Sequence, residues 1–195
     1  AYVEGVGKTI ALQSGLSNAR GDFTVTLLNS PVNNAFAIPG GYIYVTRQLV
    51  VLMNNEAELA GVLGHEVGHV AAQHSRKRQS AATRNSILGV LGTVLSGVLL
   101  GSGTAGQLGQ KIFSQGSQLL TLSYSRKQET EADNLGIAYL RRANFDPRAM
   151  STVLTSLAQQ NALEARLMGT SNQVPAWAST HPDPASRVRA ALAQA

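Results

Sequence analysis

The spacing of apolar residues divides this chain into a short region with β-strand character and a longer helical one. In residues 1–16, Val3, Val6 and Ile10 stand at the spacing of one helix face. The next stretch alternates apolar and polar positions, and two more short strands flank a Pro-Gly-Gly turn. The predicted strands are Phe23–Leu27, Asn33–Ile38 and Tyr42–Thr46. Residues 1–46 therefore predict a helix followed by a small β-sheet.

Helical patterns fill the rest of the chain. Asn55 is a candidate N-cap, and Glu56 and Glu58 place negative charge in the first turn of a helix predicted over residues 56–80. Further helices are predicted at residues 85–100, 107–122, 126–142 and 147–167, with a closing helix from Pro184. A small sheet followed by helices is an α+β arrangement. Because no linker or repeat divides the 195 residues, we expect a single domain over residues 1–195.

One stretch, residues 87–100, is apolar and uncharged over 14 residues. A helix needs about 20 such residues to cross a bilayer. We therefore favour an apolar helical hairpin over residues 85–122 that is buried or covered by a partner. A membrane segment and a flap over a cleft are the alternatives.

The strongest chemical signal is an H-E-x-x-H motif at residues 65–69, within a predicted helix. His65 and His69 are four residues apart, so both imidazoles project from one helix face and could take two corners of a zinc tetrahedron. Glu66 lies beside them, within reach of a metal-bound water. A surface helix with two chance histidines is disfavoured by Gly64 and Gly68, because both glycines cost helix stability. Their presence makes sense if another element approaches that helix face closely.

A catalytic zinc uses three protein ligands and keeps one position open. Since the chain has no cysteine, the third ligand is expected to be a carboxylate, with Glu129, Glu131 and Asp133 as candidates. Glu129 and Asp133 share a helix face, whereas Glu131 points elsewhere. One of that pair could bind the metal while the other accepts a hydrogen bond from a ligand histidine. His74 is left off the metal, because it falls on the opposite side of a continuous helix.

These motifs, in this order, resemble the family-48 zinc metallopeptidases, gluzincins that include the HtpX and CAAX prenyl protease types. The resemblance rests on NAFAIPGG at residues 34–41, VLGHEVGHV at 62–70, E-x-x-A-D at 129–133 and THPDPASRV at 180–188. It therefore covers most of the chain. Without clear membrane helices, the sequence is more similar to soluble envelope members of the BepA type than to HtpX.

The resemblance implies specific roles. His65, His69 and Glu129 would bind zinc, Glu66 would act as general base, and Asp133 would orient a ligand histidine, with His65 the expected partner. The carboxy-terminal segment would return to this site. Taken alone, a histidine before a proline is usually an ordinary loop residue.

Two roles stay open for His181 once the family pattern is considered. It could stabilise the oxyanion, or it could occupy the open zinc position and hold the enzyme latent. Arg187 would support the same pocket. Trp177 is expected to anchor the core rather than to line the substrate site.

Substrate is expected to bind extended along a sheet edge, as an added β-strand. The candidate strand contains Asn34, Ala35 and Phe36, with Asn34 reaching the substrate backbone. Phe36 is expected to pack in the core in either case.

The expected function is a zinc-dependent endopeptidase with one Zn²⁺ per chain, in which a zinc-activated water attacks the peptide bond and Glu66 is the base. The resemblance implies quality control in the bacterial envelope, with unfolded or misfolded proteins as substrates. We expect a periplasmic or lipid-anchored location, with the N-terminal signal absent from this sequence. Contact with a membrane surface or with outer-membrane assembly is left open. The alternative is a chaperone or assembly factor with a latent zinc site.

The composition of the chain excludes several classes of protein and of catalytic site. Apolar residues make up 44% and charged residues 14%, which excludes a disordered chain. The absence of cysteine excludes disulfides and thiolate nucleophiles. A formal charge of +5 and the basic run at residues 76–78 are compatible with an anionic membrane. We expect no nucleic-acid partner, since the chain has ten aromatic residues (four Phe, one Trp, five Tyr) and no nucleic-acid-binding motif.

Overall fold

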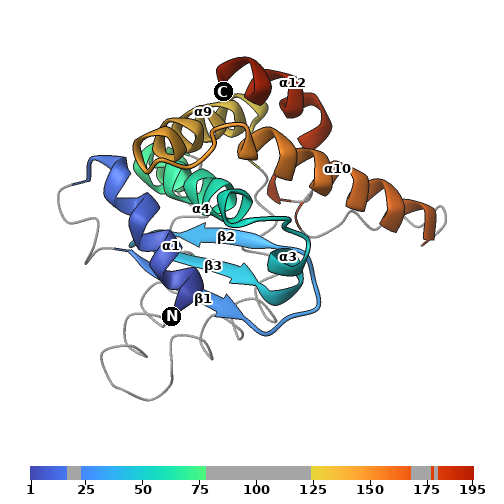
Figure 1. The fold of residues 1–195 in the computed structure, drawn as a ribbon, viewed down its shortest axis with the longest axis horizontal. Coiled ribbons are helices and arrows are strands. Elements are labelled where there is room, and N and C mark those ends of the chain that lie inside the picture. The colour runs from blue at the N-terminus through green and yellow to red at the C-terminus, as the bar shows by residue number, and fades with distance from the viewer. Residues whose placement is uncertain (17–22, 78–123, 168–176, 178–179) are drawn as a thin grey trace.

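A computed structural model describes residues 1–16, 23–77, 124–167, 177 and 180–195. This part of the chain is mostly helical and contains one three-stranded sheet, so the expected α+β class is confirmed (Figure 1). The elements are α1 (Tyr2–Ala11), a 3-10 turn (Leu12–Ser14), β1 (Thr24–Leu28), β2 (Ala35–Ile38), β3 (Tyr42–Thr46), α3 (Arg47–Val51), α4 (Glu56–Ala71), α5 (His74–Lys77), α9 (Arg126–Arg142), α10 (Ala149–Leu167) and α12 (Pro184–Gln194). The hairpin expected at residues 85–122 lies outside the described residues, and the single domain stays a prediction.

The sheet has the order β1-β3-β2, with β3 parallel to β1 and antiparallel to β2. The turn between β2 and β3 uses Gly40 and Gly41 at φ +98° and +81°, a left-handed conformation that other residues rarely adopt. Because β2 stands at one end of the order β1-β3-β2, it is an edge strand of the described sheet. Helix α4 packs against it.

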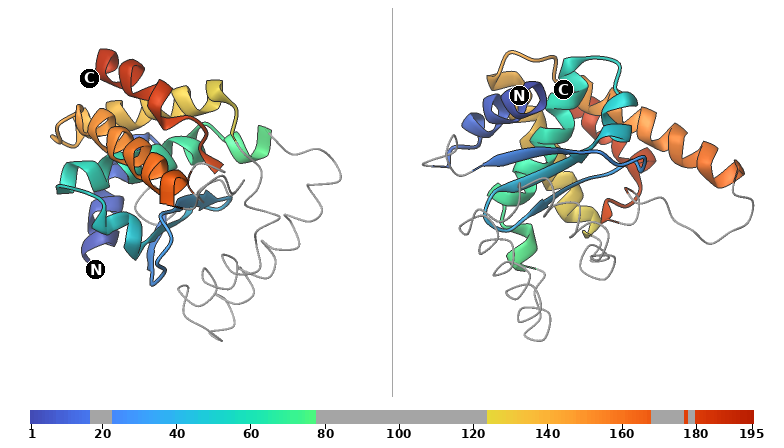
Figure 2. Two further views of the ribbon diagram at one scale, coloured as in Figure 1. Left: turned by 90° about the vertical axis from the view of Figure 1, so that its right-hand side faces the viewer. Right: turned by 90° about the horizontal axis from the view of Figure 1, so that it is seen from below.

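The two faces of the sheet are buried in different clusters. Ala35, Ile43 and Val45 join the main core, which α1, α4, α9 and α10 share. On the opposite face Phe36 stacks on Tyr44, with ring centroids 5.1 Å apart. This alternation follows from the two-residue period of a strand. Figures 1 and 2 show α4, α9 and α12 on one side of the sheet, with α4 nearest to it.

Helices α4 and α9 cross at very short distance, because glycines line the contact. A Cβ built on Gly68 would lie 3.0 Å from the backbone oxygen of Ala132, and one on Gly64 would lie 3.3 Å from Cα of Gly136. A larger residue at either position would force the helices apart. The glycines that are costly in an isolated helix therefore permit the approach that brings Glu129 to the H-E-x-x-H face.

The helix expected over residues 56–80 ends earlier than predicted. Helix α4 stops at Ala71, and Gln73 takes a left-handed conformation at φ +55° before α5 begins at His74. A left-handed residue is a common way to end a helix, but it is usually glycine or asparagine. Because glutamine carries no such signal, the pattern of apolar residues did not reveal this break. The turn redirects His74 toward the metal-binding face.

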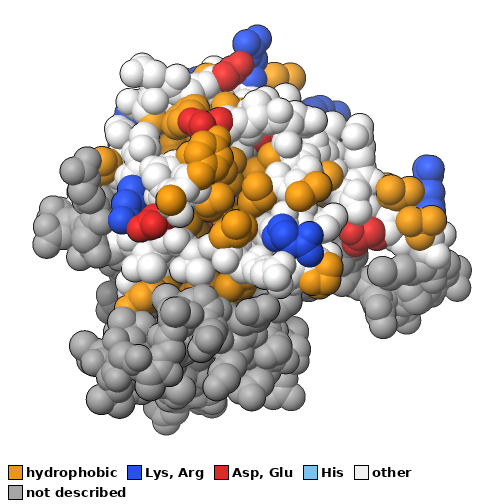
Figure 3. Space-filling view, turned by 60° about the horizontal axis from the view of Figure 1, so that its bottom comes forward, with side chains coloured by type: hydrophobic (Ala, Val, Ile, Leu, Met, Phe, Trp, Pro, Cys, Tyr) orange, Lys and Arg blue, Asp and Glu red, His pale blue; other side chains and the backbone are white. Residues whose placement is uncertain are grey.

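No described helix is both long and apolar enough to cross a membrane. On the face in Figure 3, hydrophobic side chains gather near the centre, whereas Lys and Arg side chains lie apart from one another. Helix α10 projects from the body in Figure 1, and near its end Leu163 and Leu167 are 49% and 77% exposed.

Candidate metal centre

Helix α4 supplies three of the side chains at the centre of the site. Its N-cap, Asn55, accepts a hydrogen bond from the backbone N–H of Glu58 at 3.0 Å, as expected for a cap. His65, Glu66 and His69 all lie deep in the protein, with at most 1% of each exposed. The H-E-x-x-H motif therefore faces inward, toward α9.

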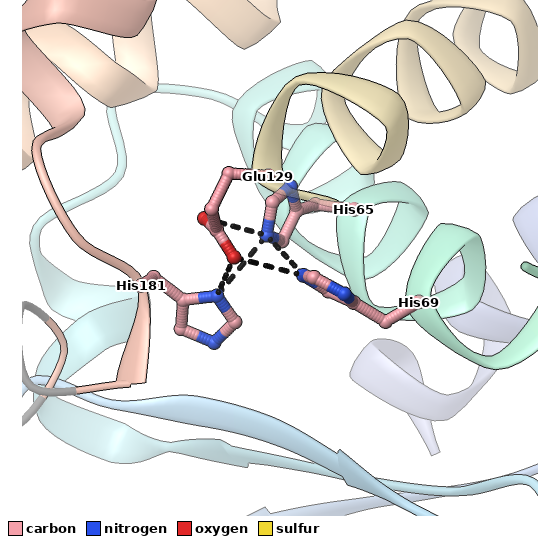
Figure 4. A group of neighbouring side chains, drawn as sticks. All are labelled: His65, His69, Glu129 and His181. Carbon is pink, nitrogen blue, oxygen red and sulfur yellow. Dashed lines mark hydrogen bonds and ion pairs between the residues drawn. The ribbon is translucent and has the colours of Figure 1, made fainter. Parts of the chain in front are cut away.

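Four side chains from three segments converge there (Figure 4). Nε2 of His65 lies 2.9 Å from Nε2 of His69. Glu129, from the first turn of α9, places one carboxylate oxygen 3.2 Å from Nε2 of His69 and the other 3.5 Å from Nε2 of His65. Nδ1 of His181 lies 3.2 Å from both Nε2 of His65 and the nearer oxygen of Glu129.

This donor set fits a metal ion. Nδ1 of His65 lies 2.9 Å from Oδ1 of Asp133, and a carboxylate only accepts, so the proton of His65 is on Nδ1. Its Nε2 therefore presents a lone pair to Nε2 of His69 and to Glu129. A cation between these three groups would accept a lone pair from each of them. Ligands of a tetrahedral zinc stand about 3.4 Å apart, close to the separations observed.

Arg187 contacts the two carboxylates of the centre, Asp133 and Glu129. Helix α12 places it in its first turn, after the N-cap Asp183 accepts a hydrogen bond from N–H of Ser186. Its guanidinium donates to both oxygens of Asp133, at 2.7 and 2.6 Å, and to Glu129. Burial opposes ionisation of both carboxyls, but their neighbours outweigh it. His181, His65 and His69 lower the pKa of Glu129, whereas Arg187 and His65 lower the pKa of Asp133.

Glu66 differs from the other carboxylates. Both of its oxygens are buried, and neither has a hydrogen-bond partner among the described residues. Burial raises its pKa, although the nearby His181 and His65 partly offset this effect. A buried carboxylate that makes no hydrogen bond and lies next to the ligand set is poised to accept a proton.

His181 is held at the centre by aromatic rings and by the backbone. The indole of Trp177 stacks on the imidazole of His181, with ring centroids 4.2 Å apart. The backbone N–H of His181 donates a hydrogen bond to the backbone carbonyl of Trp177 at 2.8 Å. Burial lowers the pKa of His181, but Glu129 and Glu66 outweigh burial and raise it. Its Nε2 lies 3.3 Å from Oε1 of Glu66, without the alignment of a hydrogen bond.

Three residues of the centre were assigned no site role from the sequence. Trp177 is buried as expected, yet it also stacks on His181. The ring of Tyr124 stacks on the imidazole of His69 with centroids 3.7 Å apart, and the backbone N–H of Tyr124 donates a hydrogen bond to the backbone carbonyl of Thr180. His74 lies outside the four-residue group, as expected, but contacts His69. The only sequence signal for Trp177 is its position four residues before His181, and Tyr124 has none.

The expected substrate strand lies next to this centre. Asn34 is 2% exposed, and its Oδ1 has no hydrogen-bond partner among the described residues. The far end of β2 reaches a cavity of about 120 Å³ that His69 also borders. The cavity is lined by Ile38, Pro39, Gly40, His69, Val70, Gln73 and Ser75. Ala35 and Phe36 are buried in the two clusters described above.

Comparison with known proteins agrees with this geometry. The sequence pattern described as peptidase family M48 matches residues 1–195. The chain belongs to peptidase family M48. Family membership and the group of His65, His69, Glu129 and His181 together indicate a metal cofactor for this M48 chain.

Two M48 relatives are similar over nearly the whole chain. It is 33% identical to a beta-barrel assembly-enhancing protease of Yersinia pestis over 190 residues, which cover 96% of the chain and 37% of that protein. It is also 33% identical to the mitochondrial metalloendopeptidase OMA1 of Schizosaccharomyces pombe, over 96% of the chain and 50% of that protein. The chain thus spans between a third and a half of these relatives.

Proposed function

We propose that this chain is a zinc-dependent endopeptidase domain. The observation that carries the proposal is the convergence of His65, His69 and Glu129 on one point. Beside it lies the carboxylate of Glu66, which has no hydrogen-bond partner among the described residues. Two histidines and a glutamate are a ligand set of catalytic zinc in peptidases. Both relatives reported above are named as proteases, which supports the same activity.

Each residue of the site has its own role in the proposed hydrolysis. When bound, zinc would polarise the peptide carbonyl and make a water acidic enough to attack it near neutral pH. Glu66 is placed to take the proton of the attacking water and to deliver it to the departing amine. Asp133 and Arg187 hold His65 and Glu129 in place. Nδ1 of His181 lies 3.2 Å from Nε2 of His65. We propose that it would occupy the position that a catalytic centre keeps open, and that it moves aside when substrate enters.

The test is metal content paired with cleavage of casein, an unfolded protein. Wild type is expected to bind about one zinc per chain and to cleave casein. Glu66→Gln should keep the zinc and lose cleavage by roughly 10²–10⁴-fold, the usual share of a general base. Glu129→Ala should lose both the bound zinc and the cleavage of casein, because it removes a metal ligand. A wild-type protein that takes up no zinc, even when zinc is added, would exclude this function.

We propose that substrate adds as a strand to the edge at β2. The support is that β2 is an edge strand of the described sheet, that Oδ1 of Asn34 has no hydrogen-bond partner among the residues the structure describes, and that the end of β2 borders the cavity beside His69. About 120 Å³ is enough for one medium-sized apolar side chain. Substrates with such a side chain near the cleaved bond should therefore be preferred.

Ile38→Ala tests the placement of substrate. Removing three carbons from the cavity wall should shift preference toward bulkier side chains, with a change of about 10-fold or more in the ratio of kcat/KM values. The measurement is cleavage of a peptide series that differs at one position. The same shift after Leu27→Ala, an exposed position on β1 that does not line the cavity, would argue against this assignment.

We further propose that the substrates are unfolded or misfolded proteins of the bacterial envelope. The Yersinia relative is named for beta-barrel assembly, which supports an envelope setting and contact with outer-membrane assembly, whereas the OMA1 relative is named as mitochondrial. A chaperone with a latent zinc site is the alternative, and the relatives' names as proteases do not favour it. If Glu66→Gln restores growth to cells lacking the gene, proteolysis is not the physiological role.

A further inference from the structure

His74 is fully buried beside the metal centre, although the proposed reaction gives it no part. Its Nδ1 lies 2.9 Å from Nδ1 of His69, whose other ring nitrogen faces Glu129. Its Nε2 lies 3.2 Å from Oε2 of Glu131. The three side chains form a row that begins at a candidate metal ligand and ends at a carboxylate that is 48% exposed.

The positions of the protons follow from the carboxylate end of this row. Glu131 can only accept, so the proton of His74 is on Nε2 and is donated to it. Nδ1 of His74 then carries a lone pair and accepts the Nδ1–H of His69. Nε2 of His69 is therefore left unprotonated, as a metal ligand must be. The opposite arrangement would place a proton on Nε2 of His69, where it would block the metal.

We propose that His74 and Glu131 are positioning residues that hold the ring and the tautomer of His69 for metal binding. Asp133 makes the corresponding contact with His65 directly. Each ligand histidine is thus supported by a carboxylate of α9, in one case through a second imidazole. The inference rests on the proposed function, because it concerns affinity for the metal.

The backbone supports this arrangement independently. The left-handed conformation of Gln73 turns the chain back, so that His74 lies against His69 instead of on the far side of a longer helix. The carbonyl of His74 accepts a hydrogen bond from Nε2 of Gln128, on α9, at 3.5 Å. Main chain and side chain of His74 therefore both bind to the helix that supplies Glu129.

The first test compares two substitutions of His74 in the full chain. His74→Asn keeps an acceptor roughly where Nδ1 stood, whereas His74→Phe keeps a ring but offers no acceptor. Zinc affinity is measured by competition with a chelator, and unfolding of the metal-free protein is measured alongside. We expect His74→Phe to weaken zinc binding by about 10- to 100-fold and His74→Asn to recover most of that loss.

The second test compares two substitutions of Glu131 that remove the same charge. Glu131→Gln retains a carbonyl oxygen that can accept from His74, and Glu131→Ala does not. We expect Glu131→Ala to weaken zinc binding more than Glu131→Gln, and to change the visible spectrum of the cobalt-loaded protein, which reports ligand geometry. Asn134→Ala, an exposed position three residues further along α9, is the matched control and should change neither.

The outcomes separate the two proposals. Equal zinc affinities for His74→Phe and His74→Asn would overturn the positioning role, as would equal affinities for the two Glu131 variants. If these variants lose affinity only in proportion to a loss of metal-free stability, His74 is a packing residue and the inference fails. A wild-type chain that binds no zinc contradicts the proposed function instead.

Discussion

At the scale of single residues, the centre collects ionisable groups that are almost completely buried. Burying a charge is costly unless it is paired, and Arg187 pairs with both Asp133 and Glu129, through two hydrogen bonds to the first and one to the second. Glu66 differs, because its oxygens have no hydrogen-bond partner among the described residues and Nε2 of His181 lies beside them, at 3.3 Å from Oε1. A buried carboxylate without hydrogen bonds lowers stability, and proton transfer is the reason to keep it.

His181→Ala tests which position this side chain occupies. Its Nδ1 stands within 3.2 Å of two candidate ligand atoms, so we expect it to fill the fourth corner of the metal site. The variant should still bind zinc through three ligands and should bind a small hydroxamate inhibitor about 10-fold or more tightly, since one position is then open. Affinity is measured by calorimetry. An unchanged hydroxamate affinity would show that His181 does not occupy the metal's open position.

At the scale of elements, the site depends on how closely α4 and α9 cross. Each helix is well defined on its own: Asn55 caps α4, and Ser125 with Gln128 forms a capping box on α9. Neither helix alone holds a metal, because the histidines are on one and Glu129 is on the other. The glycines at the crossing therefore contribute to the site without touching it.

Gly68→Ala should disturb this crossing. The new Cβ would lie 3.0 Å from the carbonyl oxygen of Ala132, so the helices must separate, at a cost of about 1–3 kcal/mol in the free energy of unfolding. Zinc affinity should fall as well, because Glu129 moves with α9. The control is Gly5→Ala in α1, where no atom lies within 4 Å.

Gly5→Ala is expected to raise stability by about 0.5–1 kcal/mol, through helix propensity alone. Both variants are measured by urea denaturation. If Gly68→Ala were stabilising to the same extent as Gly5→Ala, the close crossing would not matter for the fold.

At the scale of the whole molecule, the metal centre joins three parts of the chain that are far apart in sequence. Helix α4 supplies His65 and His69, α9 supplies Glu129, and the segment before α12 supplies His181. A bound ion would therefore stabilise the assembled fold as a whole, since no one segment holds the site.

Removal of zinc should lower thermal stability accordingly. Zinc at about a thousand times its Kd stabilises the folded state by about 4 kcal/mol, which for a chain of this size is about 8–16 °C in Tm. The measurement is thermal unfolding followed by circular dichroism, before and after a chelator and again after zinc is restored. His65→Ala is the control, and it should be insensitive to the chelator. A wild-type Tm that the chelator leaves unchanged contradicts the site.

The sequence alone determined the local parts of this protein. Helix patterns predicted α4 and α9, with Asn55 as the cap of α4, and the four-residue spacing of His65 and His69 predicted one face for both rings. These properties depend on neighbours within a few residues. The choice of Glu129 over Asp133 as the candidate ligand came from family resemblance, since their shared helix face left both possible.

Tertiary structure decided the rest. The end of α4 at Ala71, the return of His74 to His69 and the stacking of Trp177 on His181 depend on contacts between distant segments, or on a backbone conformation that its residue type does not announce. A hydrophobic pattern records which side of a helix is buried, but not what buries it. For that reason the motif was readable from the sequence, whereas the side chains that orient it were visible only in the fold.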